Sequence, residues 1–285
     1  MKRRRQFGSL AGGLAVAGWF GVLLWLERRS ALRQEVEPKP VRDARNLAVA
    51  AAGAVVVQAV EMPIVRRLAS LVERRRWGLV PRLRLPRSLE TALAVVLMDY
   101  TLYLWHVLTH RVPFLWRFHQ VHHMDRDLDA STALRFHFGE LGISVAYRSA
   151  QVLAIGTTPR ALALWQNLLM LSILFHHSNV RLPLDLERRL ARIVVTPRLH
   201  GIHHSTKAEE VSSNWSSGLT VWDWLHGTLR TDVPQDEIRI GVEGFDSPEQ
   251  VTLPKILSLP FQESVEIPST AGIPHQRQPV HELKP

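Results

Sequence analysis

The stretch YTLYLWHVLTHRVPFLWRFHQVHH, from Tyr100 to His123, places five histidines at the end of an apolar run. The first two, His106 and His110, form an HxxxH pair. Two HxxHH groups follow, made of His119, His122 and His123 and of His200, His203 and His204. Of the 14 histidines in the chain, 11 fall between His106 and His204. This density exceeds what packing requires and indicates metal binding.

The spacing of these histidines predicts two metal sites. Positions i and i+4 of a helix lie on one face with Cβ atoms about 5–6 Å apart, so His106 and His110 reach the same region. In HxxHH, the adjacent pair diverges by about 100° around the helix axis, so neighbouring histidines can serve different ions. Eight imidazoles are too many for one metal. We therefore expect two ions.

The residue types restrict the chemistry. The chain has no cysteine, which excludes disulfides, iron–sulfur clusters and thiolate-held metals. Imidazole suits zinc, copper, iron and nickel alike. The HExxH motif of zinc proteases is absent, and a mononuclear 2-His-1-carboxylate site would leave most of the histidines unexplained. A dinuclear, histidine-rich site in a membrane protein points to iron that activates oxygen.

The charge balance favours a membrane. Lys plus Arg is 35 against 26 for Asp plus Glu, and the excess lies largely before residue 90. A basic chain can bind nucleic acid or an anionic membrane surface. Here arginines flank apolar runs, and no basic stripe is interleaved with aromatic residues, so we expect no nucleic acid partner.

Three apolar runs approach the roughly 20 residues that cross a bilayer as a helix. They are 7–26, which we interpret as a retained helix rather than a cleaved signal peptide, 46–65 and 89–108. The segment 66–87 between the last two carries eight arginines and is predicted to lie in the headgroup region. Two shorter runs, 141–154 and 161–175, predict a helical hairpin that enters and leaves on one side.

The sequence thus predicts an all-α fold, an integral membrane helical bundle with a histidine-rich cap on one membrane face. Its expected parts are N-terminal membrane helices and a basic segment (1–88), a histidine-box catalytic domain (89–231) and a Pro-rich C-terminal tail (232–285). In the last two parts we expect a surface helix at 184–193, and an extended tail that is partly packed to about residue 261 and disordered beyond. The charge pattern conflicts with a cytoplasmic histidine face. The positive-inside rule places both the N-terminus and the segment 66–87 in the cytoplasm, and three full crossings then leave the histidines outside.

The histidine motifs also carry a family resemblance. HVLTH, HQVHH and HGIHHS, in this order, resemble the three histidine boxes of the fatty acid hydroxylase and sterol desaturase superfamily. The flanking sequences agree, among them TALRFHFGE at 132–140, HSNVRLP at 177–183 and NWSSGLTVWDWLHGT at 214–228. The resemblance covers about residues 95 to 230.

This resemblance implies a diiron centre. The implied ligands are His106, His110, His119, His122, His123, His177, His200, His203 and His204. His137 matches a further family position, although Phe138 replaces the usual proline, and it is either a ligand or a residue behind one. His176 is expected to be structural, and His226 stands where the family usually has phenylalanine.

Polar residues near the boxes are candidates to orient the ligands, because metal-bound imidazoles donate their second N–H to a carboxylate or carbonyl. The candidates are Asp99, Asp125, Glu140, Asn179, Asn214 and Asp223. The alternative for each is a helix cap or a surface ion pair. Three tryptophans, Trp215, Trp222 and Trp224, are candidate membrane-interface anchors.

The resemblance implies an enzyme that uses O2 to hydroxylate or desaturate a C–H bond of a lipid, such as a sterol or a fatty acyl chain. Electrons would come from a separate donor, a ferredoxin- or cytochrome-type chain. We expect a bacterial inner-membrane protein whose histidine face is cytoplasmic. The alternatives are a zinc-dependent membrane hydrolase and a membrane protein that binds or transports metal.

Overall fold

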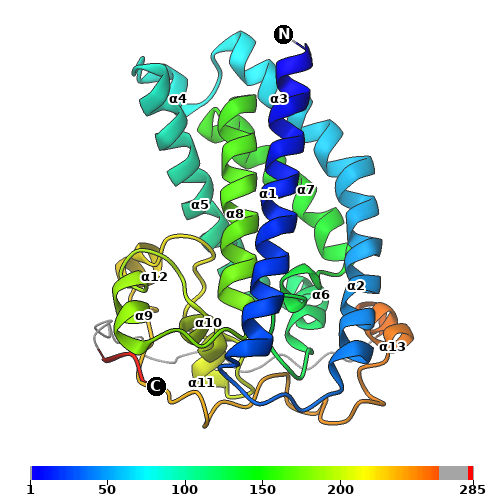
Figure 1. Cartoon of the computed structure of the whole chain (residues 1–285). Helices are drawn as coiled ribbons and strands as arrows, with labels where there is room; N and C mark the ends of the chain where they lie inside the picture. The colour runs from blue at the N-terminus through cyan, green and yellow to red at the C-terminus, as the bar shows by residue number, and fades with distance from the viewer. Residues whose placement is uncertain (1, 263–281, 285) are drawn as a thin grey trace.

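The computed structural model describes residues 2–262 and 282–284, with side chains from residue 12 onward. The predicted all-α class is confirmed: the described residues form helices and three isolated β-bridges, but no strand. The long helices are α1 (Lys2–Arg29), α2 (Lys39–Val56), α3 (Met62–Arg75), α5 (Arg87–Arg111), α7 (Phe138–Ile155) and α8 (Pro159–His177). They stand side by side in Figure 1.

The short helices gather at one end of this bundle, the lower end in Figure 1. They are α6 (Pro113–His123), α9 (Leu184–Leu190), α10 (Pro197–His203), α11 (Ala208–Val211), α12 (Val221–His226) and α13 (Leu253–Ser258), with 3-10 turns at Thr132–Leu134 and Leu259–Phe261. Only α4 (Leu79–Arg82) lies at the opposite end. The histidines of α5, α6, α8 and α10 therefore meet at a single end of the bundle.

The segment 66–87, which is predicted to lie in the headgroup region, is largely helical. Residues up to Arg75 continue the preceding helix, because α2 passes through a five-residue π-helical stretch, Val57–Glu61, directly into α3. One face of α3 is apolar and fully buried, with Val65, Ala69 and Val72 each 0% exposed. The arginines of α3 lie on its exposed face, so α3 is an amphipathic helix whose apolar side packs on the bundle.

The hairpin of α7 and α8 is longer than predicted, at 18 and 19 residues instead of about 15. Hydropathy missed the polar ends, where His137 caps α7 by accepting from the backbone N–H of Gly139 and Thr158 caps α8 by accepting from Ala161. Helix α7 ends at Gly156, whose φ of 84° is easily reached only by glycine. A Cβ on the facing Gly78 would lie 2.3 Å from the Gly156 Cα, so the two turns touch through their glycines.

Two stretches in the described residues are long and apolar enough to cross a membrane by length and composition, Lys39–Arg82 and Arg87–Arg111. Large apolar side chains also point outward along the bundle, including Leu14, Val55 and Leu168, which are 64%, 66% and 48% exposed. Such a surface is unusual for a protein surrounded by water. It is what a bundle with lipid around it requires.

The C-terminal region differs from the predicted extended tail. It contains helix α13, where Ile256 is 0% exposed and packs together with Val251 against Val121 and Met124 of the second histidine box. The predicted disorder beyond residue 261 falls mainly on residues outside the described ranges. The surface helix predicted at 184–193 ends at Leu190, and its Glu187 is fully buried because it pairs with Arg198.

Candidate metal centre

Four elements bring nine histidines together in the interior of the histidine end. Helix α5 supplies two from its last two turns, α6 supplies three, α8 ends with one, and α10 with the residue after it supplies three. They are His106, His110, His119, His122, His123, His177, His200, His203 and His204. The most exposed of these side chains, His106, is 8% exposed, and three of them are 0% exposed.

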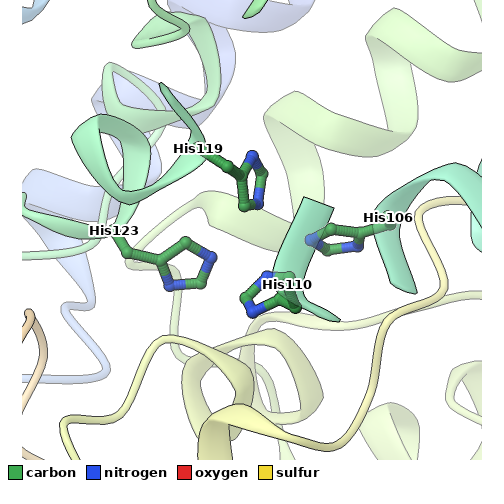
Figure 2. A group of neighbouring side chains, drawn as sticks. All are labelled: His106, His110, His119 and His123. Atoms are coloured by element: carbon green, nitrogen blue, oxygen red, sulfur yellow. The ribbon is translucent and has the colours of Figure 1, made fainter. Parts of the chain in front are cut away.

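The first imidazole group consists of His106, His110, His119 and His123. One ring nitrogen from each lies within 4.8 Å of the others, and all four residues are buried. Figure 2 shows the four rings arranged around a common space, two from the end of α5 and two from α6. The HxxxH pair and the outer members of HxxHH therefore contribute to one group, as their i, i+4 spacing predicts.

The second imidazole group consists of His122, His177, His200 and His204, again with ring nitrogens within 4.8 Å. The adjacent histidines 122 and 123 thus fall in different groups, as the helical divergence predicted. A third set, His123, His203 and His204, overlaps both groups. The two imidazole groups therefore lie next to each other, with His123 of the first group close to His204 of the second.

The distances between ring nitrogens fit pairs of imidazoles that bind the same cation. The Nε2 atom of His177 lies 3.0 Å from Nε2 of both His122 and His200, and Nε2 of His203 lies 3.1 Å from Nε2 of His106. Metal–imidazole bonds of about 2.0–2.1 Å place two ligands at right angles about 3.0 Å apart. Lone pairs that face each other at this distance repel unless a positive charge lies between them.

Hydrogen bonds at the other ring nitrogen decide which nitrogen faces the centre. The Nδ1–H groups of His106, His177 and His203 donate to the carbonyl oxygens of Trp215, Ile173 and Ser213 at 2.7, 2.7 and 2.8 Å. His119 Nδ1 donates to Glu140 Oε1 at 2.9 Å. A carbonyl can only accept, so these rings carry their proton on Nδ1 and present a free Nε2 lone pair inward.

The electrostatics keep the imidazoles neutral. Burial, followed by the proximity of other imidazoles, lowers the pKa of His122, His123 and His200 well below the usual 6.5. Burial lowers the pKa of His203 to about 3, against the opposing effect of its bond to Ser213. Neutral imidazole is the form that binds a metal.

Several buried ring nitrogens have no hydrogen-bond partner. These are both nitrogens of His123, Nε2 of His110 and His119, and Nδ1 of His122, His176, His200 and His204. Buried polar atoms without partners are costly and rare. The Nε2 atoms of His110 and His119 belong to the first imidazole group and fit ligands whose partner is a metal ion.

Of the six polar residues predicted to orient ligands, Glu140 contacts a ligand candidate directly. Asp223 acts one step further away: it accepts from the backbone N–H groups of Trp215 and Ser216 at 2.9 and 3.0 Å, and so holds the carbonyl that His106 uses. Asn214, in a left-handed conformation with φ of 52°, bonds the Leu199 carbonyl in α10.

Two more of the six hold connecting segments in place. Asn179 exchanges hydrogen bonds with the backbone of Arg33 at 2.8 and 2.9 Å and ties the end of α8 to the segment after α1. Asp99 accepts from the Leu219 N–H at 3.0 Å and from the Trp222 indole at 2.7 Å. Neither contacts an imidazole of the two groups in these bonds.

The other three histidines of the described residues, His137, His176 and His226, lie outside both groups. His137 caps α7 through Nδ1, and its Nε2 contacts the carbonyl of Leu257 at 3.2 Å. His226 packs on two tyrosines of α5, and the ring of His176 lies 4.1 Å from that of His200. Trp215, a predicted membrane anchor, is 1% exposed. Its carbonyl oxygen accepts the Nδ1–H of His106, which holds this residue in the interior.

The sixth candidate, Asp125, was predicted to orient a ligand, but its hydrogen bonds join it to a buried ion network beside the second histidine box, which sequence reasoning missed. Asp125, two residues after His123 and 0% exposed, accepts from Arg42 at 3.0 Å and from Asn46 at 2.7 Å. Arg42 also pairs with Asp129, and Arg135 donates to the Val121 carbonyl at 2.8 Å. The alternating aspartates of DRDLD were a possible signal, but Asn46 and Arg42, which donate to them, lie 79 to 87 residues away in sequence.

A comparison with known families now identifies the class. Residues 91–228 match the fatty acid hydroxylase family model, a segment that contains both imidazole groups. This match covers just under half of the chain, and it confirms the resemblance to the fatty acid hydroxylase family seen in the histidine boxes. No solved structure matches the chain.

Curated relatives are named as lipid hydroxylases and monooxygenases. The chain is 33% identical to an ornithine lipid hydroxylase of Rhizobium tropici over 56% of its own length and 47% of the relative's. It is 31% identical to the human alkylglycerol monooxygenase over 47% and 29%, and 28% identical to the rat cholesterol 25-hydroxylase over 56% and 54%. The match thus spans about half of these relatives, or less.

Proposed function

We propose that this protein is a membrane-bound diiron oxygenase that hydroxylates a C–H bond of a lipid. The observation that carries the proposal is the pair of adjacent four-histidine groups with converging ring nitrogens. The family match and the names of the relatives support an oxidoreductase that acts on lipids. Two iron ions held here would supply the activation of O2 for C–H oxidation.

The nine buried histidines have distinct roles in this proposal. His106, His110, His119 and His123 would hold one ion, and His122, His177, His200 and His204 the other. His203 lies at the boundary, 3.1 Å from His106 and grouped with His123 and His204, and would complete the first site. His137 is left out because its two nitrogens serve the backbone.

The protein's own groups prepare the site. Backbone carbonyls and Glu140 keep the protons on Nδ1, so the ligands need no rearrangement to bind. Burial of the histidines excludes bulk water, which would otherwise compete for reactive species. Hydroxylation is favoured over desaturation because the relatives are named for hydroxylation or monooxygenation.

The proposal includes a separate electron donor of the ferredoxin or cytochrome type, since a chain without cysteine holds no iron–sulfur cluster of the Cys-ligated kind. It also places the protein in a bacterial inner membrane with the histidine end in the cytoplasm, where such donors occur. The arginines of 66–87 then lie on the opposite side, against the positive-inside pattern. A cysteine at Val36, which is 62% exposed and whose backbone N–H donates to Asp127 just after the second histidine box, tests this. It should resist an impermeant maleimide in intact spheroplasts.

The proposal is tested by metal content and Mössbauer spectroscopy on protein purified in detergent after expression with labelled iron. We expect about two irons per chain and a coupled diferric signal. The double variants His110→Ala/His119→Ala and His122→Ala/His200→Ala should each lose iron and the coupled signal. His226→Phe, outside both groups, is the matched control and should retain both.

Activity is then tested with isotopically labelled O2, a reconstituted donor and a membrane lipid extract. A lipid product that gains one labelled oxygen atom supports hydroxylation, whereas loss of two hydrogens without gain of oxygen indicates desaturation. Stoichiometric zinc after iron-replete expression, with no iron signal, would overturn the oxygenase and favour a hydrolase or a metal-binding protein.

A further inference from the structure

Helix α12 presents a row of large apolar side chains on the outside of the protein. Val221, Trp224 and Leu225 are 41%, 51% and 48% exposed. The neighbouring segment adds Ile193, which is 63% exposed and whose carbonyl accepts from the backbone N–H of Thr220 at 3.1 Å. We call these four residues, Ile193, Val221, Trp224 and Leu225, the apolar ledge.

The other side of α12 is fixed to α5. The Trp222 ring lies 4.8 Å from the ring of Tyr100, and the His226 ring lies 4.9 Å from that of Tyr103. The Trp222 indole donates to Asp99 at 2.7 Å, and the His226 Nε2 lies 3.2 Å from the Tyr100 hydroxyl. The ledge is therefore held at a defined height along α5.

This height falls inside a candidate membrane span. Helix α5, Arg87–Arg111, is one of the two stretches able to cross a membrane by length and composition. The contact residues Asp99 to Tyr103 lie 8 to 12 positions before Arg111, which is about 12–18 Å along a helix that rises 1.5 Å per residue. Figure 1 shows α12 beside the lower part of the bundle, higher than α10.

The rim of the ledge carries positive charge. Arg189 and Arg192 are exposed on and just after α9, next to Ile193 in sequence. Tryptophan and leucine bordered by arginine are the composition of segments that lie in the boundary between headgroups and acyl chains. The arginines would face anionic headgroups at the membrane surface.

We propose that the apolar ledge is a membrane-contact surface, which inserts into the headgroup and acyl boundary of the bilayer that α5 crosses. The occupant is the lipid bilayer, because the ledge continues the apolar outer surface of α5, where Val96 is 37% exposed and Leu108 is 39% exposed. This inference rests on the membrane placement within the proposed function and is independent of the metals. It brings helix α12, which carries Asp223, and the loop from Trp215 that leads into this helix close to the lipid.

The absence of cysteine allows a direct test. Single cysteines are introduced at Trp224 or Leu225 in the full chain, spin-labelled, and reconstituted in vesicles of phosphatidylcholine with phosphatidylglycerol. Collision rates with O2, which partitions into lipid, and with a polar nickel chelate are measured by power saturation. Val96→Cys on α5 is the control for lipid exposure, and Val36→Cys at the histidine end is the control for water exposure.

We expect the labels at 224 and 225 to collide with the nickel chelate several-fold less often than the label at 36, and with O2 nearly as often as the label at 96. Nickel accessibility at 224 and 225 equal to that at 36, with 96 protected, would overturn the ledge and leave the membrane span intact. Nickel accessibility at all four positions would overturn the ledge together with the membrane placement. Iron content, measured on the same samples, reports separately on the proposed oxygenase.

Discussion

Glu140 provides a sharp test of how the chain tunes its metal centre. It is the carboxylate that accepts the Nδ1–H of His119 at 2.9 Å, and it is 5% exposed. Removing the partner behind a metal-bound histidine typically weakens metal affinity by about 10–100-fold, or about 1.4–2.7 kcal/mol. A hydrogen bond to a charged group is worth about 1.5–3 kcal/mol, which is the same range. Glu140→Ala should therefore weaken the first site by this amount.

The assay is an anaerobic Fe(II) titration of apoprotein in detergent, with both binding steps resolved. The second imidazole group has no described hydrogen bond to Glu140, so its affinity should not change. Glu90→Gln is the matched control, because Glu90 is a buried carboxylate of α5 that pairs with Arg76 at 2.7 Å, near the opposite end of the bundle. Wild-type affinity at both steps in Glu140→Ala, or equal weakening of both, would refute the reasoning.

Three further predictions concern stability. Arg42→Met leaves the buried carboxylates of the ion network without their main cation, so the free energy of unfolding in detergent should fall by about 3–5 kcal/mol; a loss below 1 kcal/mol would contradict the network. Gly218→Ala places a Cβ 2.1 Å from the Asp99 carboxylate and should lower the melting temperature. Gly142→Ala in helix α7 adds a Cβ that has no other atom within 4 Å, so it should be neutral or stabilising. Equal changes in melting temperature would argue against close packing at Gly218. The pKa of about 3 for His203 lies below its value near 6.5 in the unfolded chain, so between these pH values only the unfolded state binds the proton. The free energy of unfolding of the apoprotein should therefore fall by about 1.4 kcal/mol per pH unit for each such histidine as pH falls from 6.5 toward 3. Denaturant unfolding at several pH values checks this, and a flat profile would refute it.

The histidine patterns alone determined much of the site. HxxxH and HxxHH are local helical relations, so the chain sequence already dictates that residues 106 and 110 share a face and that residues 122 and 123 diverge. The apolar runs likewise predicted the long helices, since their length and composition are local properties. Their polar ends and the continuation of α2 into α3 were missed, because hydropathy does not register helix caps or the outward arginines of an amphipathic helix.

The tertiary structure decided which segments contribute to the same imidazole group and what orients each ring. His177 joins the second group, and His137 stays outside, because helix packing and not spacing sets the distance between residues far apart in sequence. The partners of the imidazole Nδ1 atoms are mostly backbone carbonyls, which every residue carries and no motif can reveal. Trp215 and Trp224 look alike in sequence, yet one is buried and the other exposed, because the loop between them turns around Asp223.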